Sequence, residues 1–128
     1  MAGGQVLRAE MPPSIGVRRE SLLIDLVHLS KYTLGERALE CELLGLFKAQ
    51  AGVYLARMQA ADCVKTWTDA AHTLKGSARG VGAWAVADQA ELAEALRNPD
   101  GAARDDALMM LEAAIDETVA HIRLLMDE

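Results

Sequence analysis

The sequence is poor in the side chains that usually fill β-sheets. Aromatic residues make up only 4% of the 128 residues, although hydrophobic residues make up 52%. The apolar content comes mainly from alanine and leucine, which are good helix formers, and β-branched residues are scarce. The composition therefore predicts an all-α protein, and the length suits one domain with a buried core.

The signals of several other protein classes are also missing. No apolar run approaches the roughly 18 residues that a membrane-spanning helix needs. Residues 1–20 lack the apolar stretch of roughly 7–15 residues that a secretory signal contains. The net charge is −6 and no cluster of Lys and Arg interrupts it, which argues against a nucleic-acid partner. We therefore expect a cytoplasmic protein that contacts neither membrane nor nucleic acid.

Cysteine is nearly absent, and its two occurrences do not suggest a metal site. Cys41 and Cys63 lie in separate apolar-periodic segments, and neither has a Cys or His at metal-ligand spacing. We interpret them as two small buried thiols, and we expect neither a bound metal nor a cofactor.

Glycine and proline without periodicity mark residues 1–19, which we predict to be a flexible leader before a domain that spans 20–128. After the leader, helical periodicity is nearly continuous. The predicted helices cover 21–34, 36–60, 62–79, 83–97 and 102–127. Short connections force consecutive helices to run antiparallel. The sequence thus predicts an up-down-up-down four-helix bundle with a short extra N-terminal helix.

The predicted helices also have predicted ends and apolar faces. Asp62 is the expected N-cap of the third long segment, and Gly80 and Gly82 are expected to end it. For the helix over 36–60 the predicted face is Leu39, Leu43, Leu46, Phe47, Val53 and Tyr54. For the helix over 62–79 it is Val64, Trp67, Ala71, Leu74, Ala78 and Val81. For the helix over 102–127 it is Leu108, Leu111, Ile115, Thr118, Ile122 and Leu125.

His72 lies on the side of its helix opposite to this apolar face. At 100° per residue, the six core positions average roughly 130° away from it. The imidazole is therefore expected to project towards water. The other two histidines, His28 and His121, have no such context and are interpreted as bystanders.

The same arithmetic predicts the neighbours of His72 on the exposed side. Thr68 and Asp69 lie one turn before it, and Lys75 and Gly76 lie one turn after it. Arg79 lies two turns after His72, almost in line with it. An exposed, neutral imidazole can attack phosphorus and carry a phosphoryl group. Lys75 could meet the negative charge of that group, while Gly76 leaves room for a partner. The positive charge of Arg79 would attract an acidic partner surface.

Spacing alone leaves other functions open. This face could be an ordinary solvated surface with a bystander histidine, on a bundle that serves only as a scaffold. Asp25-x-x-His28 and Asp69-x-x-His72 also imitate the acid-x-x-His pairs of metal-binding bundles, although such ligands must converge on the interior. The dimerisation half of a sensor kinase also presents a histidine on a helix, but no nucleotide-binding segment is visible here.

The residues around His72 favour phosphoryl transfer over these alternatives. The motif is Ala71-His72-Thr73-Leu74-Lys75-Gly76-Ser77-Ala78, followed by Val81-Gly82-Ala83. It resembles the signature of the histidine-containing phosphotransfer (HPt) family over about residues 70–96. Outside this stretch the similarity is limited to the number and length of the helices.

The resemblance implies a phosphoryl carrier in a two-component phosphorelay, without ATP-dependent kinase activity. By this similarity His72 is the phospho-acceptor, Lys75 stabilises the phosphohistidine and Gly76 keeps the approach open. The expected partners are receiver domains of response regulators or of a hybrid histidine kinase, and the expected state is a monomer. Thr68, Asp69 and Arg79 join Gly76 as candidate partner-binding residues.

One further residue follows from the resemblance. The family tends to place an acidic or amide residue late in the next helix, beside the histidine. Glu94 falls at that spacing and would accept a hydrogen bond from one ring nitrogen, which fixes the reactive tautomer. This sequence departs from the commoner pattern in having Ala93 where a leucine is usual. The departure weakens the assignment of Glu94 to the position beside His72.

Overall fold

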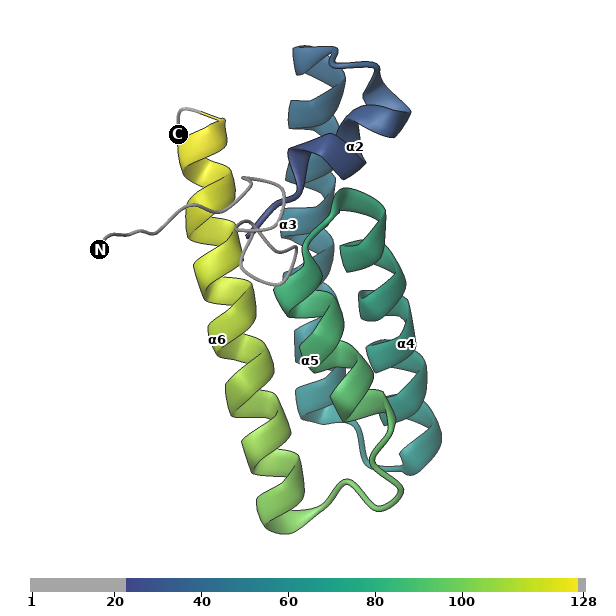
Figure 1. The fold of residues 1–128 in the computed structure, drawn as a ribbon. Helices are drawn as coiled ribbons and strands as arrows, with labels where there is room; N and C mark the ends of the chain where they lie inside the picture. Colours follow the sequence, from purple (N-terminus) through teal and green to yellow (C-terminus); the bar gives the residue numbers. More distant parts are fainter. Residues whose placement is uncertain (1–22, 127–128) are drawn as a thin grey trace, which may run out of the picture.

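The computed structural model describes residues 23–126 (Figure 1). Over this range every regular element is a helix and no strand occurs. The helices are α2 (Leu26–Thr33), α3 (Arg37–Ala60), α4 (Val64–Val81), α5 (Trp84–Glu94) and α6 (Gly101–Leu125). The predicted leader over 1–19, and the predicted start of the first helix at residue 21, lie outside the described residues.

The four long helices run alternately up and down, and short α2 lies across one end of α3 (Figure 1). Helix α4 packs against both α3 and α5, and α6 closes the bundle against α5 and α3. The predicted all-α architecture is confirmed, with four long helices and a short one before them. None of the helices described between residues 23 and 126 is long and apolar enough to cross a membrane.

The predicted apolar face of α4 is largely correct. Its buried residues are Trp67, Ala70, Ala71, Leu74, Ala78 and Val81. Val64 is wrong, because it is the first residue of α4 and its side chain is 47% exposed. The face of α6 is also correct at its centre, where Leu111, Ile115, Thr118 and Ile122 are buried.

The predicted face of α3 is correct at Phe47, and Leu43 and Tyr54 are partly buried against the core, but Leu46 and Val53 are wrong. The buried residues are Leu44, Phe47, Ala51, Leu55 and Met58, which recur at spacings of three and four. Leu46 and Val53 were placed in the core by the sequence and are 55% and 49% exposed. Apolar side chains occur on several sides of this helix, so periodicity alone does not identify its buried face. The buried face includes Ala51, whose small side chain allows close packing.

Both cysteines differ from the prediction of buried thiols. Cys41 is half-buried and Cys63 is exposed. Cys63, rather than the predicted Asp62, is the N-cap residue of α4, and its carbonyl oxygen accepts the hydroxyl of Thr66. At the other end, Gly82 adopts the left-handed conformation that ends α4, with a φ of 76°.

The turn between α4 and α5 holds the chain that leads into α2. The backbone N–H of Asp25 donates to the carbonyl of Gly82 at 2.9 Å, and the indole N–H of Trp84 donates to the Asp25 carboxylate at 3.0 Å. The other carboxylate oxygen accepts the backbone N–H of His28 and caps α2. The His28 ring stands edge-on to Trp84, with centroids 4.9 Å apart. This end of the bundle is therefore closed by α2.

Candidate functional site

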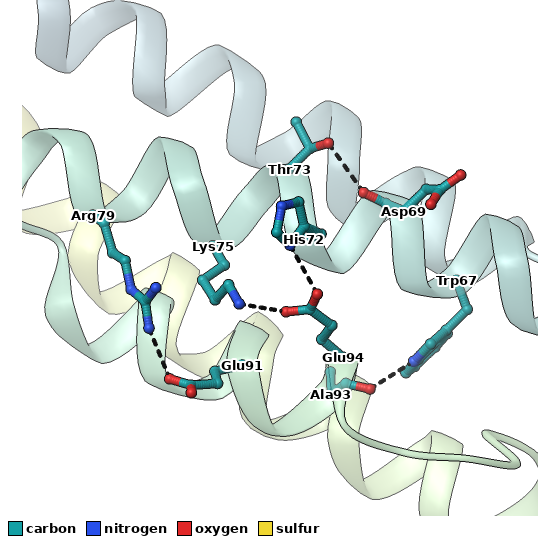
Figure 2. Close-up of polar contacts among 9 residues, drawn as sticks. All are labelled: Trp67, Asp69, His72, Thr73, Lys75, Arg79, Glu91, Ala93 and Glu94. Atoms are coloured by element: carbon teal, nitrogen blue, oxygen red, sulfur yellow. Dashed lines mark hydrogen bonds and ion pairs between the residues drawn. The ribbon is translucent and has the colours of Figure 1, made fainter.

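His72 projects from the outer side of α4, as the sequence predicts, and its side chain is 68% exposed. Its Nδ1 lies 2.8 Å from Oε2 of Glu94, which comes from the end of α5 (Figure 2). A carboxylate can only accept this hydrogen bond, so Nδ1 carries the proton of the neutral ring. Nε2 then has the free lone pair, and it points away from Glu94 (Figure 2). The site thus presents one nucleophilic nitrogen to solvent.

Glu94 also binds Lys75. The Lys75 Nζ lies 2.6 Å from Oε1 of Glu94, so the two carboxylate oxygens bind two different partners. The Lys75 side chain is only 16% exposed because it lies along the surface between α4 and α5. Its hydrogen bond is the main cause that lowers the pKa of Glu94, burial opposes the shift, and the hydrogen bond from His72 adds to it. The carboxylate is consequently ionised at neutral pH.

The remaining predicted residues after His72 lie along the same side of α4. Gly76 is exposed, and a Cβ added there would meet nothing within 4 Å. Arg79 is not a free cation, since its guanidinium binds the Glu91 carboxylate at 2.9 Å (Figure 2). Lys75 and Arg79 therefore each bind a glutamate of α5, one turn apart.

The two predicted residues before His72, Thr68 and Asp69, differ in exposure and in their contacts. Asp69 is exposed and forms an i,i+4 ion pair with Lys65 at 2.7 Å. Its backbone carbonyl accepts the hydroxyl of Thr73 at 3.0 Å. Thr68 is half-buried, one turn before His72. Neither side chain forms a hydrogen bond or ion pair with the imidazole.

A buried hydrogen bond fixes the position of Glu94 relative to His72. The indole N–H of Trp67 donates to the carbonyl of Ala93 at 2.8 Å, across the interface between α4 and α5 (Figure 2). Trp67 is fully buried, and Ala93 directly precedes Glu94. Sequence reasoning assigned Trp67 to packing alone, and it did not single out Glu91. The only signal in the sequence for the positioning role of Trp67 was that a buried indole N–H needs an acceptor.

The two acid-x-x-His pairs do not converge on an interior metal site. The Asp25 carboxylate accepts hydrogen bonds from Trp84 and the His28 backbone, whereas Asp69 pairs with Lys65 on the surface. Within the described range no three His, Cys, Asp or Glu side chains are grouped so that they could hold a metal ion. The arrangement at His72 instead combines an exposed ring nitrogen, a carboxylate that accepts the Nδ1–H and a nearby cation.

Comparison with protein families agrees with this geometry. The model of the Hpt domain family matches residues 42–123, which is more than half of the chain and contains every candidate site residue. The chain therefore belongs to the Hpt domain family, whose members carry phosphoryl groups on histidine in phosphorelays. Neither the curated proteins nor the solved structures contain a match.

Proposed function

We propose that this chain is a histidine phosphotransfer protein that shuttles a phosphoryl group between receiver-domain aspartates through phosphohistidine at His72. The observation that carries the proposal is the ring's environment: Nδ1 is held by Glu94, and Nε2 is free at the surface. A histidine that served only packing would have its ring inside the fold, as the His28 ring is against Trp84. This one keeps its nucleophilic atom available to a partner.

The chemistry needs only groups that the site supplies and groups that a receiver brings. The Nε2 lone pair attacks the phosphorus of an aspartyl phosphate, the P–N bond forms, and the P–O bond to the aspartate breaks. Transfer to a second receiver reverses these steps. Receiver domains would contribute the Mg²⁺ and the acidic pocket that stabilise the transferring group, so this chain needs no cofactor and no kinase activity of its own.

Lys75 would meet the phosphoryl oxygens, because its amine is already beside His72 on the shared Glu94. The open surface at Gly76 would let the rim of the receiver's pocket approach the ring. Thr68, Asp69 and Arg79 lie on the same side of α4 and would form the polar border of the contact. We expect a small, short-lived interface formed by a cytoplasmic monomer, as a carrier must release each partner.

A phosphotransfer assay tests the proposal. Purified chain is mixed with a panel of phosphorylated receiver domains and followed for acid-labile, alkali-stable label. We expect label on the wild type and on His121→Gln, and none on His72→Gln. Label that persists on His72→Gln would overturn the assignment of His72. A folded wild type that accepts no phosphoryl group from any receiver would favour the scaffold alternative.

A further inference from the structure

We infer that Glu94 exchanges ionic partners when His72 is phosphorylated, and that its negative charge keeps the phosphorylated ring protonated. This inference rests on the proposed function. It assigns Glu94 a charge-dependent positioning role that a hydrogen-bond acceptor without charge could not perform.

Before transfer, Glu94 has one charged partner, Lys75. Oε1 of Glu94 binds the Lys75 ammonium at 2.6 Å, and Oε2 accepts the Nδ1–H of a neutral ring at 2.8 Å. The strongest partner of the carboxylate is therefore Lys75. In this state the lysine is held beside Glu94 and does not extend to Nε2.

Transfer changes the charge of the ring. The attacking Nε2 of neutral imidazole uses its lone pair to form the P–N bond, while Nδ1 keeps its proton. The product ring is thus an imidazolium cation, and it carries a phosphoryl group with about two negative charges. Glu94 then faces a full positive charge at Nδ1, where it previously faced a neutral N–H group.

The new charges favour a different pairing. The phosphoryl oxygens attract Lys75, whose flexible stem allows the ammonium to move from Oε1 towards Nε2. The Glu94 carboxylate stays with the ring cation at Nδ1, a charge-assisted hydrogen bond that is stronger than the one it replaces. Glu94 thereby releases the lysine to the phosphoryl group and takes the ring as its ionic partner.

Other charged groups around the ring do not offer the same compensation. On α4, Asp69 is paired with Lys65, and Arg79 is paired with Glu91 of α5. From α3, Arg57 lies over the Tyr54 ring and lines a hollow with Asp69 and Thr73, and His72 is not part of that lining. Among the described side chains, Glu94 is the only carboxylate within hydrogen-bonding distance of the His72 ring.

The proton at Nδ1 matters for onward transfer. A phosphorylated ring that loses this proton would have to leave as an imidazolate anion, which is a far poorer leaving group than neutral imidazole. By holding the proton, Glu94 extends the pH range over which the phosphoryl group can be passed on. Glu94→Gln keeps an oxygen that accepts the Nδ1–H but removes the charge and the second oxygen that binds Lys75, whereas Glu94→Asp keeps the charge and both oxygens.

The test phosphorylates the protein without any partner, using phosphoramidate, a small phosphoryl donor. The titration of the phosphorylated ring is then followed by ³¹P and ¹⁵N NMR in the wild type, Glu94→Gln, Glu94→Asp and Glu91→Gln. Glu91 is the matched control, because it binds a cation of α4 one turn away and does not bind His72. Circular dichroism checks that all four proteins keep the same helix content.

We expect the phosphorylated ring of Glu94→Gln to lose its proton about one pH unit below the wild type, the lower end of the effect of a nearby opposite charge. Above both midpoints, onward transfer to a receiver should then be about tenfold slower in Glu94→Gln, because one pH unit changes the protonated fraction about tenfold. Glu91→Gln should titrate like the wild type. Glu94→Asp, which retains the charge, should titrate above Glu94→Gln.

Two results would overturn the inference in different ways. Phosphorylated Glu94→Gln that titrates like the wild type would show that the charge is irrelevant, and His72 would remain a carrier. A wild type that gives no phosphohistidine signal, with phosphoramidate or with any receiver, would overturn the proposed function itself and this inference with it.

Discussion

Two histidines of this chain have similar local sequences and very different surroundings. His28 and His72 each follow an aspartate by three residues, and each lies on a helix. The His28 ring packs against Trp84, and its Nε2 is buried with no hydrogen-bond partner among the described residues. The His72 ring is exposed, with Nδ1 bound to Glu94. One histidine contributes its ring to packing, and the other offers its lone pair to solvent.

The difference shows which neighbours matter. In neither case does the preceding aspartate bind the ring: Asp25 caps α2, and Asp69 pairs with Lys65. The decisive partner of His72 is Glu94, 22 residues away on α5. The reactive state of a histidine is thus determined by which ring nitrogen is bound and which is accessible, and tertiary structure decides both.

The largest expected effect separates the two histidines completely. His72→Gln should lose all phosphoryl label but change stability by less than about 0.5 kcal/mol, because the side chain is mostly exposed. His28→Phe should retain the label, and its unfolding free energy should stay within about 1 kcal/mol of the wild type, because the residue removed has an unpaired buried nitrogen. Radiolabelling and thermal unfolding measure both effects. Loss of label in His28→Phe would contradict the comparison.

The second prediction concerns the end of the bundle that His28 occupies. Gly82→Ala forces a left-handed residue at φ 76° and places a Cβ 2.9 Å from the backbone oxygen of Asp25. The expected cost is at least about 1–2 kcal/mol. Each kcal/mol lowers the unfolding midpoint by roughly 4 °C in a domain of this size. Calorimetry measures the midpoint, and phosphoramidate labelling of the folded variant should be normal. An unchanged midpoint would show that α2 is not held at this turn.

The third prediction concerns access to His72. Gly76→Leu should slow transfer from receivers at least several-fold, because the added side chain occupies open surface beside the ring. Phosphorylation by phosphoramidate should be nearly unaffected, since this donor is small. The ratio of the two rates is the measurement. Equal slowing with both donors would mean that the leucine disturbs the histidine, and equal rates would show that the gap is not needed.

The smallest expected effect is the pH dependence of stability. The pKa of Glu94 is lowered in the folded state, mainly by the hydrogen bond from Lys75. The contribution of Glu94 to the free energy of unfolding is therefore fully present above the ordinary pKa of 4.5, and it is lost as the pH falls through the lowered folded pKa. The difference in unfolding midpoint between wild type and Glu94→Gln should therefore be largest at neutral pH and shrink towards pH 3. A difference that grows on acidification would contradict the direction of this shift.

The sequence predicted helix number, helix order and the orientation of His72, because these follow from periodicity within single segments. The buried face of α3 was wrong at Leu46 and Val53, because apolar side chains surround this helix and its own periodicity does not single out the face that contains Leu44, Ala51 and Leu55. The N-cap of α4 was also wrong by one residue, because helix ends are less sharply defined than helix interiors.

Glu94 came from the family resemblance, and its distance from His72 depends on the turn at Gly82 and on the Trp67 hydrogen bond. Contacts of that kind join residues far apart in sequence, and no local pattern encodes them.

The hydrogen bond from Trp67 to Ala93 also determines how much of the molecule a designer would have to transplant. His72, Lys75 and Gly76 could be copied onto any exposed helix, but Glu94 would have no defined position there. A transplant would have to carry α4 and α5 together and keep Trp67 buried, because the indole hydrogen bond links the end of α5 to α4. A surface site of this kind is reproduced only when one buried side chain is reproduced with it.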